Sequence, residues 1–244
     1  MSRHTTAKTH VRLKRFRNNP FFGAQDIDVM NGGEFLNAAK VNLIFWGAFW
    51  TNSSSNPTHE MVTKDVKKIL SSTFMRELKE YGIDSKASFY KAIVVSNSEP
   101  RNEFSDHDIE EIVTSLIGSG DLPDPDTEDG PFLNCVIMPE GIVSKEAGEK
   151  GYHFSRKPRG FRGRLQLVYI LFGTRDFISN VFSHELIESC TNPNEKGVRI
   201  KSTQHRNTGD EIADICQGSV GKLRNGVSVQ SYWSQKERAC IIPK

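Results

Sequence analysis

One short segment combines metal-ligating residue types at a spacing that brings them together. The segment SHELIESCTNP contains His184, Glu185 and Glu188. On a helix, residues four apart share a face, so His184 and Glu188 could bind one ion while Glu185 lies one step around the cylinder. In the HExxH motif the first and last residues ligate zinc, and the intervening glutamate polarises the bound water. This sequence has the variant HExxE, in which the last ligand would be a carboxylate.

A third ligand must come from elsewhere in the chain, because two protein ligands leave a zinc site incomplete. The downstream segment GDEIADIC contains Asp210, Glu211 and Asp214 within about one turn. It follows the HExxE segment at a distance that allows the chain to return to the ion. The sequence therefore predicts that one of these acids completes the site.

The same residues also have a purely structural interpretation. A polar stripe facing water would place one histidine and two glutamates on a helix without any ion. Here, however, the stripe continues from Phe177 and Val181 on the same face, which favours an inward orientation. Buried carboxylates beside a histidine are costly unless a cation neutralises them, so either a metal ion or an arginine is required.

The helix that carries these residues has clear sequence boundaries. Thr174 is a candidate N-cap, Asp176 falls in the first turn, and Pro193 cannot continue the helix. These signals predict a helix of about four turns between Thr174 and Pro193.

Strands and helices alternate before this helix. Apolar and β-branched runs predict strands at 40–50, 88–96, 132–139 and 165–172. Helical spacing predicts a long helix over 59–81 and another beginning after Ser105. We therefore expect one α/β domain over residues 36–244, with a mixed, mostly parallel sheet flanked by helices, after a basic flexible leader at 1–35.

Composition limits the classes of function. The chain has 244 residues, of which 36% are apolar and 25% charged, as in folded rather than disordered proteins. No apolar run is long enough to span a bilayer, so no transmembrane helix is expected. The basic start lacks the apolar block of a secretory signal, so we expect a cytoplasmic or non-classically exported protein.

Two segments, the basic leader and residues 156–164, form local clusters of positive charge. A net charge of +2 does not favour a membrane or nucleic-acid partner, and the basic leader matches no known nucleic-acid-binding motif. The segment RKPRGFRGR, residues 156–164, contains five Lys or Arg. It is either a solvated loop or the border of a cleft that selects acidic peptides.

Three blocks of the sequence resemble a known family. In order and approximate spacing, SHELIESCTNP, EIADIC and VSVQSYWSQKERAC are similar to the C-terminal half of the phosphate-induced, exordium-like family and its bacterial zincin-like metallopeptidase relatives. VNLIFWG and GYHF also resemble blocks of that family. The resemblance covers about residues 40–242 and implies a single zincin-like domain.

The resemblance implies a role for each residue of the motif. His184, Glu188 and Asp214 would be the metal ligands, with Glu211 as the reserve choice for the third. Glu185 would be the base that acts on water. We expect zinc as the ion, with calcium or another divalent cation as the alternative.

Two further pairs of residues match family blocks. Tyr152 and His153 would either donate hydrogen bonds to a developing oxyanion or form a satisfied pair in the core. Cys216 and Cys240 correspond to family cysteines that are expected to pair. The chain departs from the family in its basic leader, in lacking a signal peptide, and in the stretch GSVGKLRNG, which stands where the family has a glycine-rich segment.

These features predict a zinc metallopeptidase acting on a peptide or protein. Water would attack a carbonyl, Glu185 would carry its proton to the leaving amine, and the strand at 165–172 would align an extended substrate by β-addition. The alternative is a non-catalytic binding or signalling protein on the same scaffold, in which the metal is structural.

Overall fold

The computed structural model describes residues 28–31, 33–84, 86–126, 130–145, 150–201 and 211–243. Most of the predicted basic leader, residues 1–27, lies outside the described residues, as does Asp210. Among the described helices, none is long and apolar enough to cross a membrane.

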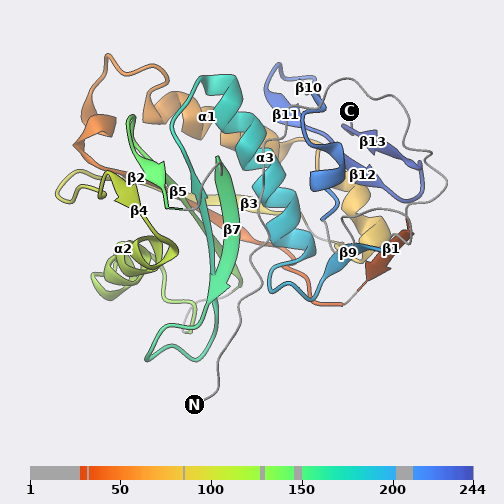
Figure 1. Cartoon of the computed structure of the whole chain (residues 1–244), viewed down its shortest axis with the longest axis horizontal. Helices are drawn as coiled ribbons and strands as arrows, with labels where there is room; N and C mark the ends of the chain where they lie inside the picture. Colours follow the sequence, from red (N-terminus) through yellow and green to blue (C-terminus); the bar gives the residue numbers. More distant parts are fainter. Residues whose placement is uncertain are drawn as a thin grey trace.

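A five-stranded sheet forms the centre of the protein (Figure 1). Its order is β3 (Ser88–Val95), β2 (Lys40–Trp46), β5 (Phe132–Ile137), β8 (Leu165–Ile170) and β7 (Gly151–Arg156). The first four strands are parallel, and β7 runs antiparallel to β8 at one edge. The inner strands read as continuous apolar runs because both of their faces are covered.

Helices cover both faces of this sheet, as Figure 1 shows. α1 (His59–Ser71) and α3 (Arg175–Thr191) share a core with Leu43 and Phe45 of β2. α2 (Asp106–Gly118) packs on the opposite face with Ile44 and Trp46. Alternate residues of β2 thus pack into two hydrophobic cores, one on each face of the sheet. The predicted α/β class with a mostly parallel sheet flanked by helices is confirmed.

The long helix predicted over 59–81 is wrong in its length. α1 ends at Ser71, and a 3-10 helix, η2 (Arg76–Tyr81), follows after a break. At the break, the Ser72 hydroxyl donates to the Ile69 carbonyl and accepts from the Phe74 amide. Side-chain hydroxyls of this kind compete with the backbone bonds that would continue a helix.

Between the predicted strands at 132–139 and 165–172, where the sequence analysis assigned no strand, lie β6 (Val143–Ser144) and β7. The position of β7 in the sheet decides whether the predicted substrate-aligning strand is open to a substrate. The strand at 165–172 is β8, which is hydrogen-bonded on both sides, to β5 and to β7. The prediction that it aligns a substrate by β-addition is therefore wrong, and β7 has the edge position instead.

Short antiparallel pairs complete the fold. They are β1 (Asp28–Asn31) with β9 (Val198–Lys201), β10 (Val220–Lys222) with β11 (Ser228–Gln230), and β12 (Tyr232–Ser234) with β13 (Ala239–Ile241). β4 (Glu103–Phe104) pairs in parallel with β6, and two 3-10 helices, η1 (Ala48–Thr51) and η3 (Asp214–Cys216), lie in connections. Because β1 lies within residues 1–35, the predicted leader extends too far.

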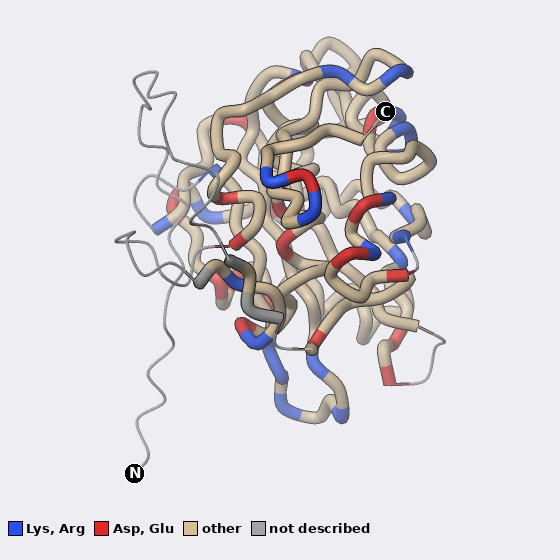
Figure 2. Tube along the Cα trace, turned by 90° about the vertical axis from the view of Figure 1, so that its right-hand side faces the viewer, with Lys and Arg blue, Asp and Glu red and all other residues tan. Residues whose placement is uncertain are grey.

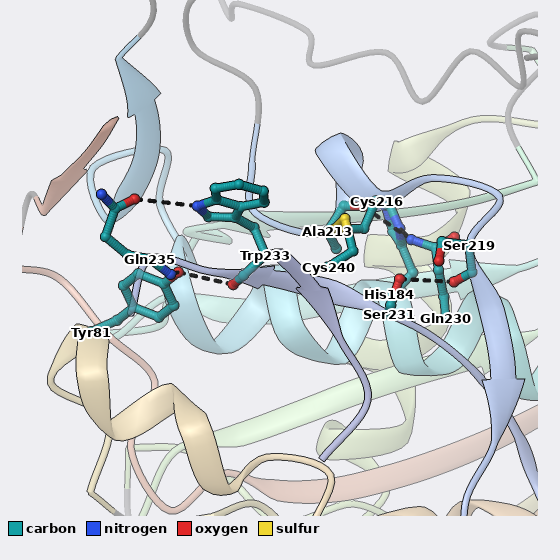
Figure 3. The surroundings of a disulfide bond; sticks show 10 residues. All are labelled: Tyr81, His184, Ala213, Cys216, Ser219, Gln230, Ser231, Trp233, Gln235 and Cys240. Atoms are coloured by element: carbon teal, nitrogen blue, oxygen red, sulfur yellow. Dashed lines mark hydrogen bonds between the residues drawn. A yellow bond between two sulfur atoms is a disulfide. The ribbon is translucent and has the colours of Figure 1, made fainter. Parts of the chain in front are cut away.

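A disulfide joins Cys216 at the end of η3 to Cys240 in β13 (Figure 3). This is the pair that the family resemblance implied. The crosslink ties η3, which begins at Asp214, to the C-terminal strands. The two other cysteines, Cys135 and Cys190, are buried and free.

Candidate metal centre

α3 forms as its capping signals predict. The Thr174 hydroxyl accepts a hydrogen bond from the Phe177 amide at 3.2 Å, and the helix continues to Thr191. The helix lies between the central sheet and β11, so its C-terminal half is buried on all sides. His184, Glu185 and Glu188 therefore lie inside the protein rather than in water.

A first group of ligating atoms lies around His184. Its Nε2 is 3.1 Å from Glu188 Oε1 and 3.6 Å from Asp214 Oδ1. One ligating atom from each of these three residues lies within 4.8 Å of the other two. The fold thus brings together the three residues that the sequence proposed as ligands, with Asp214 returning to α3 at the start of η3.

A second group lies around His153 of β7 and includes the reserve ligand Glu211. His153 Nδ1 is 3.5 Å from both Glu185 Oε2 and Glu188 Oε2, and its Nε2 is 3.5 Å from Glu211 Oε1. His153, Glu188 and Glu211 also offer ligating atoms within 4.8 Å of one another. Glu188 therefore belongs to both groups.

Of the two roles predicted for Tyr152 and His153, the core position describes Tyr152, which lies on the other face of β7 from His153. Neighbouring residues of a strand point to opposite faces. The Tyr152 ring stacks 5.7 Å from the Phe154 ring and packs with the core on the α2 side of the sheet. His153 faces α3 and is buried beside the carboxylates of Glu185, Glu188 and Glu211.

Gly151 lets β7 approach α3 closely. A Cβ atom at this position would lie 3.0 Å from Glu185 Oε1 and would collide with the Val181 side chain. The absence of a side chain at Gly151 therefore allows His153, two residues further along β7, to reach the carboxylates of α3.

Several buried polar atoms of the cluster make no hydrogen bond. Within the described residues these atoms are His153 Nδ1, His184 Nε2, Glu185 Oε2 and Glu188 Oε1. The His184 and Glu188 atoms approach to 3.1 Å, but without hydrogen-bond geometry. Because buried polar groups are nearly always satisfied, these atoms fit the donor set of a cation.

Burial and mutual proximity shift the pKa values in the metal-free protein. Burial raises the pKa of Glu185 and of Glu211. At Glu188, burial would raise the pKa, but His184 and neighbouring groups lower it to about 2. Burial would lower the pKa of His184, but the Glu188 carboxylate and its neighbours raise it to about 10. Without a metal, the His184 imidazolium partly neutralises the acids.

Asn192, which follows α3 directly, was not predicted as part of the site. Its Nδ2 donates to Glu211 Oε1 at 2.7 Å, and its Oδ1 accepts from the Gly197 amide at 2.7 Å. Asn192 thus holds the Glu211 carboxylate in place. The only sequence signal is its position in TNP, immediately after the HExxE helix.

Gln230 of β11 was also missed, because glutamine is not an ordinary metal ligand. Its backbone N–H donates to Ser183 Oγ, and its Nε2 lies 2.5 Å from His184 Nδ1 and 3.1 Å from the Ala213 carbonyl (Figure 3). Coordination through His184 Nε2 requires a proton on Nδ1, which must be donated to an acceptor. The imidazolium of the metal-free protein and an imidazole that binds metal through Nε2 both carry a proton on Nδ1, so in either state the Gln230 amide would turn by 180° and present its oxygen to Nδ1.

A cavity of about 540 Å³ opens at the N-terminal end of α3. It does not contain the ligating cluster; Lys150 in its wall is followed in the chain by Gly151, which lies close to Glu185. Its apolar lining consists mainly of Ile142, Val143, Leu171, Phe172 and Phe177. The cavity suits an apolar side chain more than a highly charged one.

The basic segment 156–164 forms the loop between β7 and β8, which Figure 2 shows with blue segments at the bottom of the view. Arg156 pairs with Asp106 of α2 at 2.9 Å, and Arg164 Nε donates to Ser155 Oγ. The segment carries four exposed cations, which are Lys157, Arg159, Arg162 and Arg164. Part of the segment is therefore structural, and part presents charge to solvent.

No protein-family model matches the chain, and no curated protein is significantly similar to it. Any functional conclusion therefore depends on the geometry of the cluster and on the resemblance of the sequence blocks.

Proposed function

We propose that this protein is a metal-dependent hydrolase, most simply a zinc metallopeptidase with a zincin-like domain. The observation that carries the proposal is the convergence of His184, Glu188 and Asp214, of which His184 Nε2 and Glu188 Oε1 are buried and make no hydrogen bond in the described protein. The resemblance of the HExxE block and its two companion blocks to zincin-like relatives supports the same conclusion.

The donor set fits zinc better than calcium. One imidazole nitrogen and two carboxylates suit Zn²⁺, whereas Ca²⁺ takes six to eight oxygen ligands. When bound, zinc lowers the pKa of a coordinated water and polarises a substrate carbonyl.

The remaining steps belong to residues of the chain. Glu185 Oε2, which makes no hydrogen bond, would accept a proton from the attacking water and deliver it to the leaving amine. β7, at the edge of the sheet beside α3, would align an extended peptide by main-chain hydrogen bonds. The cavity beside Lys150 would accept an apolar side chain of that peptide.

The test combines metal analysis with peptide cleavage. The purified chain should contain zinc and cleave a library of unstructured peptides. Glu185→Gln should retain the metal but lose about 10²- to 10⁴-fold in rate, because a general base contributes that much. Glu111→Gln, an exposed substitution on α2, is the matched control and should change neither quantity.

Two outcomes would count against the proposal in different ways. A natively folded protein that binds no metal would refute the metal site itself. A protein that binds metal but cleaves nothing, with Glu185→Gln indistinguishable from wild type, would refute the hydrolase.

A second candidate function has an observation of its own. The side chains of Glu185 and Glu188 are only 1–2% exposed, which leaves little open surface at which a substrate could meet them. Near-complete burial favours a structural ion in a non-catalytic binding or signalling protein. For that function, metal removal should lower the melting temperature while no peptide is cleaved.

A further inference from the structure

We propose a second cation site, formed by His153, Glu188 and Glu211, so that Glu188 bridges two ions. This inference rests on the proposed function, which assigns the first ion to His184, Glu188 and Asp214. The second site uses residues from β7, α3 and the segment before η3, none of which belongs to the first site except Glu188.

The two oxygens of Glu188 face different imidazoles. Oε1 is 3.1 Å from His184 Nε2, and Oε2 is 3.5 Å from His153 Nδ1. Each triad separately offers three ligating atoms within 4.8 Å of one another. A carboxylate whose oxygens point to separate nitrogen donors has the arrangement of a bridging ligand, as in two-metal hydrolytic sites.

Unsatisfied buried atoms point to a ligand at the second site as well as at the first. The His153 side chain is only 8% exposed, and its Nδ1 has no hydrogen-bond partner among the described residues. Glu211 is buried, and Asn192 holds its carboxylate at 2.7 Å in the manner of an outer-shell residue that orients a metal ligand.

Charge balance favours two ions over one. Glu185, Glu188, Glu211 and Asp214 bring four carboxylates into one mostly buried cluster. With all four ionised, a single divalent cation would leave two negative charges uncompensated, and a protonated His153 would still leave one; the raised pKa values of Glu185 and Glu211 in the metal-free protein reflect the same lack of compensating charge. Two divalent cations neutralise the cluster completely, which matters because uncompensated buried charge is strongly unfavourable.

The test is the number of metal ions bound by the whole chain. Chelator-treated protein is titrated with Zn²⁺ alone and analysed by calorimetry and by native mass spectrometry. We expect two equivalents for the wild type, one for His153→Ala and for Glu211→Gln, and a loss at both sites for Glu188→Gln. His107→Ala, on the exposed surface of α2, is the matched control and should bind two.

The outcomes separate this inference from the proposed function. One equivalent in the wild type overturns the second site. If His153→Ala then leaves that ion bound, His153 is a counter-ion. If His153→Ala abolishes the binding, His153 is a ligand of a single site. No zinc in folded wild-type protein refutes the proposed function itself. If His153→Ala fails to fold by circular dichroism, His153→Gln and Glu211→Gln replace it.

Discussion

Glu188 is the residue on which both candidate triads depend. It lies one helical turn after His184, and β7 supplies a second imidazole from the opposite side. The Glu188 carboxylate therefore links the HExxE motif to His153 of β7, which is not part of that motif. Gln230 and Asn192 are important for the same site, because Gln230 orients the ligand His184 and Asn192 orients the ligand Glu211.

Gln230 should control the metal affinity of His184. Gln230→Ala removes the partner of Nδ1 and should weaken zinc binding about 10- to 100-fold, as removal of outer-shell partners does. Gln230→Glu supplies a carboxylate acceptor for the Nδ1 proton and should preserve or strengthen binding. Competition with a chromophoric chelator measures both affinities.

Gln235→Ala is the control for these variants, because Gln235 bonds Trp233 and Tyr81 rather than His184. A purely structural role for Gln230 predicts that the alanine and glutamate variants lose affinity equally. That result would remove Gln230 from the metal centre.

At the scale of elements, α2 shows how local sequence signals stabilise the scaffold behind the site. Asp108 Oδ2 accepts from the Ser105 backbone N–H at 2.8 Å and from the Ser105 hydroxyl at 2.6 Å. Burial would raise the pKa of Asp108, but the two bonds from Ser105 lower it below the ordinary value. The charged form is thus favoured in the folded state.

Asp108→Ala should destabilise the protein by about 1 kcal/mol at pH 7, because it removes the N3 side chain of the capping box with Ser105. A lowered folded-state pKa contributes stability above the unfolded pKa of about 3.9, and this contribution is lost as pH falls through the folded value. The difference between variant and wild type should therefore shrink below about pH 4. Urea unfolding at several pH values measures it.

The exposed Asp84→Ala substitution is the control for this measurement and should be neutral throughout. A destabilisation by Asp108→Ala that stays constant from pH 7 to pH 3 would show that the charge of Asp108 does not contribute.

At the scale of the whole molecule, a nearly neutral chain carries an exposed basic loop at one end of the edge strand β7. Arg156 is engaged with α2, whereas Lys157, Arg159 and Arg162 are exposed. A substrate aligned along β7 would extend toward this loop. Clustered charge at such a position attracts oppositely charged ligands and is screened by salt.

Arg159→Glu should slow cleavage of acidic peptides by roughly three- to tenfold at low salt and leave neutral peptides unaffected, since the effect is electrostatic. The difference should disappear near 1 M salt, where the Debye length is about 3 Å. Kinetic assays at two salt concentrations measure this, with exposed Lys86→Glu as the control. Rates that respond to neither salt nor Arg159→Glu would assign the loop a structural role only.

Local patterns were sufficient for much of the fold. The start and end of α3, the N-terminus of α2 and the cores of β2, β5 and β8 follow from caps and apolar periodicity, which act over a few residues. The break after Ser71 was not predicted because the apolar residues keep a helical spacing on both sides of the break. The helix ends there because the Ser72 hydroxyl forms hydrogen bonds with the backbone.

The HExxE spacing by itself determined that His184 and Glu188 share one helix face, because that proximity is set by helix geometry alone. Only the tertiary structure decided that β7 is the edge strand, that His153 rather than Tyr152 faces the carboxylates, and that both Glu211 and Asp214 return to α3. These are contacts between segments far apart in the chain. They depend on how α3 is enclosed by the sheet and the C-terminal strands, which no local spacing encodes.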